Sequence, residues 1–176
     1  MAYTFYNTRG LVLGREEEGD ARFVITILTA EYGIIFADAR GLHKNTSRLK
    51  YALDTLTEGE YSLIRGKYGW RIVNARSDVY WYTNEIRKRE NADVVARVLR
   101  LVRGVVPRDQ AEKEVFEIVM GFLNSVRIVS KEDLALLEIH TVYHILGALG
   151  YVASQDNLTT YEPWSSRTAL EIGGAR

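Results

Sequence analysis

The chain has 176 residues, 47% hydrophobic and 26% charged, so it is long enough to bury a core and has the composition of an ordinary globular protein. It has no cysteine, which excludes disulfides and thiolate metal sites, and no apolar run reaches the roughly 18 residues that a bilayer-spanning helix needs. The formal net charge is zero, but segments 39–53 and 61–77 each hold four cations and no acid, so a local basic patch is compatible with the neutral total.

The first 82 residues hold 13 of the 19 aromatic side chains and show β-type patterns. Gly10 predicts a bulge or bend in the first strand, Glu16–Asp20 a polar turn, and the glycines at 66 and 69 a hairpin. Five short strands with a bent first strand favour a small barrel, with the five-stranded oligonucleotide-binding (OB) barrel as the leading candidate. The expected strands are Tyr3–Arg15, Arg22–Thr29, Gly33–Arg40, Glu60–Arg65 and Trp70–Ala75.

From about Thr83 the apolar residues recur at helical spacing. We expect a helix over Glu85–Arg103 and a second helix opened by a capping-box-like Asp109-x-x-Glu112. A third runs from Ser130-x-x-Asp133 through Leu149, with Gly150 as its stop. This last helix is apolar nearly all round, which predicts that it forms the centre of a helical bundle.

These patterns predict an α+β fold in which an N-terminal five-stranded OB-fold β-barrel precedes an α-helical domain. The expected units are an OB-fold barrel over residues 1–80, a helical domain over 81–152, and a weakly structured tail over 153–176. The N-terminus lacks a charged start followed by an apolar block, so we expect no secretory signal and a cytoplasmic protein.

Two basic segments are candidates for phosphate contact. The loop after the third strand and its continuation carry Arg40, His43, Lys44, Arg48 and Lys50. The hairpin region carries Arg65, Lys67 and Arg71, with Tyr68 and Trp70 as aromatic rings that could stack on bases. A solvated charged loop is the alternative for the cations, and core packing is the better interpretation of Trp70.

No residue pattern points to catalysis or to a cofactor. His140-x-x-x-His144 has a spacing that can hold a metal, but a third ligand is not evident, so interior or interface histidines are the favoured interpretation. Glu16–Glu18 fits a solvated turn better than a metal site. We therefore expect a protein that is not an enzyme and that has no metal or cofactor.

Several short motifs, in order and spacing from Tyr3 to about Tyr151, resemble those of the RecO family of bacterial recombination mediators. The resemblance rests on Thr8-Arg9-Gly10-Leu11-Val12-Leu13, Asp20 to Thr29, Glu31-Tyr32-Gly33, Ala39-Arg40-Gly41, Ser47-Arg48-Leu49, Tyr61 to Gly66, and Leu149-Gly150-Tyr151. It implies an OB barrel followed by a helical domain, and a nucleoid-associated protein of recombinational DNA repair.

RecO proteins bind single- and double-stranded DNA, anneal complementary strands and act with RecR to load RecA on DNA coated by single-strand-binding protein. The resemblance assigns DNA contact to the basic loop (Arg40, Lys44, Arg48) and to the strand-end Arg9 and Arg22. It also implies a docking site for the acidic, aromatic-ended tail of single-strand-binding protein. Our hypothesis is that Phe122, Leu123 and Arg127 form this site. Core packing is the alternative interpretation of the two apolar residues.

The sequence differs from the usual family pattern in its cysteines and at one strand residue. Many members carry a four-cysteine zinc module after the Leu-Gly-Tyr motif, whereas this sequence has no cysteine, as in the metal-free members. Asp38 stands where the family usually has an apolar residue. Two other functions stay open: a protein-interaction adaptor whose barrel binds a protein, and a metal-dependent nuclease that would use His140 or His144.

Overall fold

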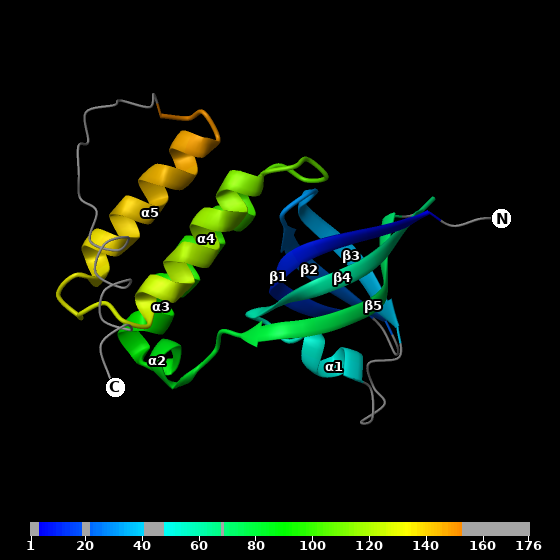
Figure 1. Cartoon of the computed structure of the whole chain (residues 1–176), viewed down its shortest axis with the longest axis horizontal. Helices are drawn as coiled ribbons and strands as arrows, with labels where there is room; N and C mark the ends of the chain where they lie inside the picture. Colours follow the sequence, from blue (N-terminus) through cyan, green and yellow to red (C-terminus); the bar gives the residue numbers. More distant parts are fainter. Residues whose placement is uncertain (1–3, 19–21, 41–47, 68, 153–176) are drawn as a thin grey trace, which may run out of the picture.

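The computed structural model describes residues 4–18, 22–40, 48–67 and 69–152, and for Arg40 and Arg48 it describes the backbone only (Figure 1). A barrel formed by the N-terminal half stands beside a group of helices formed by the C-terminal half (Figure 1). Among the described residues, no helix is long and apolar enough to cross a membrane.

Five strands form a closed barrel in the order β1-β2-β3-β5-β4, and β4 pairs back onto β1. All neighbouring pairs are antiparallel except β3 and β5, which pair in parallel over a short stretch. This is the strand arrangement of an OB fold, so the predicted fold class is confirmed. The strands are β1 (Phe5–Glu18), β2 (Arg22–Thr29), β3 (Gly33–Arg40), β4 (Thr57–Gly66) and β5 (Gly69–Tyr80).

Gly10 lies where β1 leaves its pairing with β4 and continues along β2. A Cβ atom at this position would lie 2.6 Å from Cγ2 of Ile27 and 3.2 Å from the ring of Tyr61, both in the barrel interior. The absence of a side chain therefore allows the two sheet halves to approach. The irregularity in the β1–β2 ladder falls between Val12 and Gly14, a little beyond the predicted position.

The strands are longer than the sequence pattern predicts. β1 continues through Glu18 and pairs with β2, so Glu16–Glu18 is part of a strand and the predicted polar turn over these residues is wrong. A short helix, α1 (Arg48–Ala52), precedes β4 and lies beneath the barrel; it was not predicted (Figure 1).

The helices are α2 (Asn84–Arg87), α3 (Arg89–Val105), α4 (Lys113–Val126) and α5 (Leu134–Ala148). The first predicted helix is divided because Lys88 has an extended ψ of 133°. The predicted capping box is wrong: Asp109 has a left-handed φ of 56°, and α4 begins later, at Lys113.

Helix α5 lies at the outer side of the group, whereas α4 lies between it and the barrel (Figure 1). It buries Leu134, Leu137, Thr141 and Ile145, while Ile139 is 66% exposed. The prediction that α5 forms the centre of the bundle is therefore wrong, since a uniformly apolar helix need not have neighbours on every side.

The C-terminal stop of α5 is confirmed. Gly150 has a left-handed φ of 76°, its N–H donates to the carbonyl of Gly147, and the N–H of Tyr151 donates to the carbonyl of Leu146. This is the Schellman pattern, in which glycine satisfies the last helical carbonyls.

One apolar cluster joins the barrel to the helices. Leu11, Leu28 and Ile34 from the strands pack in the same cluster as residues of α3, α4 and α5. A second cluster, which includes Ile25, Leu63 and Trp70, fills the barrel interior. Helices α3, α4 and α5 therefore cover one side of the barrel.

Candidate nucleic-acid interface

Strand register brings residues from four separate segments into one row across the barrel wall. Asp38 of β3 lies opposite Val24 of β2 and beside Arg71 of β5, and Arg71 pairs with Ile64 of β4. Their sequence neighbours Ala37, Ala39, Trp70, Ile72 and Leu63 are buried in the barrel. Because side chains alternate between the two faces of a strand, this row points outward.

Arginines surround this row. Arg22 donates from Nε and Nη2 to Oδ1 of Asp38 at 3.1 and 2.8 Å, and a third guanidinium nitrogen lies 3.3 Å from Oε2 of Glu18. The pKa of Arg22 is raised above its ordinary value, chiefly by the hydrogen bond to Asp38. Arg71 is exposed and makes no ion pair with any residue that the structure describes.

Arg108 reaches the same side of the barrel from the segment between α3 and α4. It forms isolated bridges with Gly33 and Ile34 of β3, and its guanidinium lies 4.6 Å from the ring centre of Phe36, which is 37% exposed. We define the barrel face as Arg22, Phe36, Asp38, Arg71 and Arg108. It combines cations with an exposed aromatic ring, as a surface for nucleic acid requires.

The hairpin end of the barrel carries a second cation–acid contact. Arg65 donates to Oδ2 of Asp109 at 3.2 Å and lies 5.1 Å from the ring centre of Trp70. The indole Nε1 of Trp70 donates to Oδ1 of the same carboxylate at 2.5 Å. Trp70 is only 5% exposed and packs edge-on against Tyr6, so it belongs to the core and is not a stacking platform.

Of the remaining residues predicted to contact DNA, only some have side chains that the structure describes. His43, Lys44 and Tyr68 lie outside the described residues, and the side chains of Arg40 and Arg48 are also outside them. Lys67 is exposed at the hairpin, next to Arg65, and Lys50 lies half-buried on α1. The part of the basic loop that the structure describes therefore contributes no placed side chain except Lys50.

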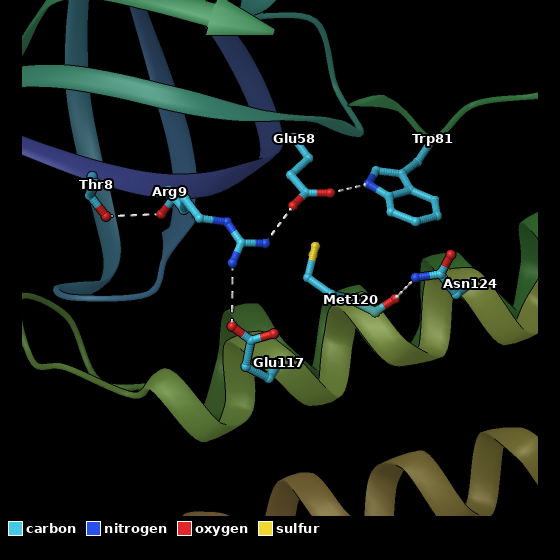
Figure 2. Close-up of polar contacts among 7 residues, drawn as sticks. All are labelled: Thr8, Arg9, Glu58, Trp81, Glu117, Met120 and Asn124. Carbon is cyan, nitrogen blue, oxygen red and sulfur yellow. Dashed lines mark hydrogen bonds and ion pairs between the residues drawn. The ribbon is translucent and has the colours of Figure 1, made fainter. Parts of the chain in front are cut away.

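Arg9 faces the helices and is held by two acids (Figure 2). Its Nη2 donates to Oε1 of Glu58 at 2.9 Å, and its Nη1 lies 3.6 Å from Oε1 of Glu117 on α4. Glu58 also accepts a hydrogen bond from Nε1 of Trp81 at 3.0 Å. The hydrogen bond to Glu58 is the main cause of the raised pKa of Arg9. This arrangement joins barrel and helices, so Arg9 is set apart from the barrel face.

The structure contradicts the predicted partner site. Phe122 is 3% exposed and Leu123 is fully buried, both in the apolar cluster that joins α4 to the barrel. Arg127 lies 5.9 Å from the ring centre of Trp81, close to that junction. Helical spacing placed the two apolar residues together but could not show which way they face.

A cavity of about 430 Å³ lies between the barrel and α3. Its apolar wall includes Leu13, Leu56 and Leu99, and two arginines of α3, Arg100 and Arg103, also line it. Arg103 lies 3.5 Å from Glu16, and both guanidinium-bearing side chains are exposed. Such a cavity suits an apolar group carried next to a negative charge.

The two histidines of α5 contact one another, with 3.0 Å between their Nε2 atoms. The pKa of His140 is lowered, mainly by burial and then by the neighbouring His144. No group of three or more histidines, aspartates and glutamates that could hold a metal ion occurs among the residues that the structure describes. His140 is half-buried and His144 is exposed, so the pair lies on the surface of α5 and the prediction of interior histidines is wrong.

Sequence reasoning missed Arg108 and Phe36. Arg108 follows Pro107 in a loop between two helices, and nothing local to it indicates that it reaches β3. Phe36 was assigned to a strand, but its exposure depends on which barrel positions the helices cover.

Comparisons with known proteins agree with this geometry. The family model described as Recombination protein O N terminal matches residues 1–74, which span β1 to the first half of β5. DNA repair protein RecO of Acetivibrio thermocellus is 28% identical over 151 residues, covering 84% of this chain and 58% of the relative. DNA repair protein RecO of Synechococcus sp. is 27% identical and covers 86% and 56%.

A third relative, DNA repair protein RecO of Gloeobacter violaceus, is 24% identical and covers 99% of this chain and 68% of its own length. The chain spans somewhat more than half the length of the first two relatives. The matches extend well beyond the barrel into the helices, so the similarity covers both parts of the chain. The chain is therefore similar to RecO proteins over both its barrel and its helices.

Proposed function

We propose that this chain is a non-enzymatic recombination mediator of DNA repair that holds DNA on the barrel face. The observation that carries the proposal is that Arg22 and Arg71 lie beside Asp38 on one face of an OB barrel, while Arg108 covers the exposed Phe36 two residues along the same strand. The face made by strands 2 and 3, together with the loop between strands 4 and 5, is where OB folds bind oligonucleotides. The names of the relatives, DNA repair proteins, support the same role.

The chemistry of the face suits a phosphate backbone. Guanidinium groups donate in a fork that matches phosphate oxygens, and an aromatic ring accepts a base face whatever its sequence. Aligning two strands along one cationic face reduces the repulsion between their phosphates, which is the step that strand annealing requires. No proton transfer or bond cleavage is needed, so no catalytic group is part of the proposal.

Handing coated single strands to RecA with RecR requires contacts with protein partners as well. We assign the acidic, aromatic-ended tail of single-strand-binding protein to the cavity between the barrel and α3. Leu13, Leu56 and Leu99 would receive the aromatic side chain, and Arg100 with Arg103 would meet the acids. This assignment replaces Phe122 and Leu123, which are buried.

The DNA part is tested by fluorescence anisotropy of a labelled single-stranded oligonucleotide at several salt concentrations. Each phosphate contact adds about 0.7 to the slope of log affinity against log salt on single strands. We expect Arg71→Ala to weaken binding and lower that slope by about 0.7. Arg89→Ala, which removes an exposed cation from α3, is the matched control and should leave the slope unchanged. Equal losses in both variants would remove the barrel face from the proposal.

A protein-interaction adaptor is the competing function, and the cavity beside α3 is the observation in its favour. It predicts no DNA binding even at low salt together with retained binding of a partner. The same anisotropy series, combined with a titration of a labelled acidic peptide ending in Phe, separates the two functions. If both sites exist, Arg100→Ala should weaken binding of the peptide and leave DNA binding unchanged.

A further inference from the structure

Two described arginines on this side of the barrel are held by acids. Arg22 is bound by Asp38 and Glu18, and Arg65 is bound by Asp109. Arg71 stands beside Asp38 in the strand register. A surface that binds DNA through its cations thus carries carboxylates at the positions where phosphates would come.

Asp38 is fixed near the middle of this surface. Its side chain is 23% exposed, less than that of Arg22 at 49%, and both Nε and Nη2 of Arg22 donate to one of its oxygens. It stands on β3 with strands paired on both sides. The strand pairing fixes the backbone of Asp38, and the two hydrogen bonds from Arg22 hold its carboxylate on this face.

Asp109 is fixed by different means. Its backbone is left-handed, its N–H donates to the carbonyl of Ile34 at 3.3 Å, and its carboxylate accepts from both Trp70 and Arg65. The loop that carries Asp109 is also held by a hydrogen bond of 3.2 Å, which the N–H of Ile34 donates to the carbonyl of Pro107. The acid comes from the helical half of the chain and reaches the hairpin end of the barrel.

We propose that Asp38 and Asp109 act as built-in competitors of the DNA phosphates, Asp38 on the barrel face and Asp109 beside Arg65 at the adjoining hairpin end, and that together they set the affinity for DNA. Each carboxylate cancels the charge of an arginine that would otherwise neutralise a phosphate and release a counterion. Their effect is to hold DNA loosely and reversibly, which suits a protein that must pass a strand to another. This inference rests on the proposed DNA-binding function.

The size of the effect follows from the salt dependence of binding. Freeing one cation adds about 0.7 to the salt slope on a single strand. If the wild type and the variant bind DNA equally near 1 M salt, this difference in slope raises the DNA affinity of the variant roughly five-fold at 0.1 M salt for each acid removed. The double variant should gain about twenty-five-fold at the same salt.

The experiment compares Asp38→Asn, Asp109→Asn and the double variant with the wild-type chain by anisotropy. Asparagine keeps the shape of each side chain, its amide oxygen still accepts from Trp70, and it tolerates the left-handed backbone at position 109. Asp78→Asn is the control, because it changes the net charge equally and breaks the pair with Arg76, which lies at the far end of β5. Unfolding midpoints of all variants are measured alongside.

Tighter binding with a steeper slope in Asp38→Asn and Asp109→Asn, but not in Asp78→Asn, supports the inference. If all three tighten equally, net charge alone acts and the inference is overturned. Unchanged or weaker binding of a folded Asp38→Asn, while the wild type binds, also overturns it and leaves the proposed function standing. If neither the wild type nor any variant binds at low salt, the proposed function fails and the inference fails with it.

Discussion

The junction between barrel and helices offers the sharpest test of the energetics, through Arg9→Met. Glu58 is 9% exposed and its carboxylate has two donors, Arg9 and Trp81 (Figure 2). Methionine keeps the apolar stem of Arg9 but removes the charge, so Glu58 keeps a single donor. The buried carboxylate then loses much of the compensation for its lost hydration.

The expected loss of folding free energy is about 2 kcal/mol. Breaking a fully buried ion pair costs roughly 3–5 kcal/mol, whereas an exposed pair contributes roughly 0–1 kcal/mol. The pair lies between these limits, because the side chain of Glu58 is 11% exposed while that of Arg9 is 51% exposed and can still be reached by water. We therefore place the effect between the two ranges.

Urea unfolding followed by tryptophan fluorescence and circular dichroism measures this loss. Glu58→Gln in the Arg9→Met background should recover about 1 kcal/mol, because the remaining group no longer carries a buried charge. Glu117→Gln is the control: its contact with Arg9 is exposed on both sides, so its effect should stay below about 0.5 kcal/mol. An Arg9→Met loss no larger than that of Glu117→Gln would refute the reasoning.

Two further outcomes follow from the geometry. Gly33→Ala should destabilise the protein by about 2 kcal/mol or more in the same urea assay. The reason is that φ of Gly33 is +61° and that a Cβ atom there would lie 2.2 Å from the carbonyl oxygen of Gln110. A loss of stability below about 0.5 kcal/mol would contradict this. The pKa of His140 is lowered in the folded chain, mainly by burial, so the unfolded chain binds the proton more readily and stability should fall as the pH drops below about 6.5 towards the folded pKa. His140→Gln should flatten that dependence, and an unchanged pH profile would exclude His140 as its source.

Local pattern predicted the strongest elements well. Arg22–Thr29 and Gly33–Arg40 have the predicted bounds, because β-branched runs with turn residues at their ends leave little choice. β4 and β5 were predicted too short: their outer residues, such as Thr57 and Tyr80, pair with one another through the ladder, which no local period reveals. Helix α1 has five residues and was too short to show a period.

Tertiary contacts explain the wrong helix start. Asp109-x-x-Glu112 has the spacing of a capping box, but Trp70 and Arg65 bind the carboxylate of Asp109 instead. These donors lie about 40 residues away in the sequence, so the competing interaction could not be seen locally. The site depended on long-range register in the same way, since Asp38 and Arg71 were known to be on strands but their adjacency comes from a short parallel pairing.

The zero net charge of the chain is a weak argument against DNA binding, because what a phosphate senses is the arrangement of charge within about 10 Å at ordinary salt. Arg76 is paired with Glu60 and Asp78, and Asp78 lies seven residues along β5 from Arg71, about 23 Å away for an extended strand. Those acids are counted in the total but are screened from the barrel face. Asp38 also contributes a single negative charge to the total, but it lies beside Arg71 and binds Arg22. Removing its charge should therefore change DNA affinity more than removing the charge of Asp78.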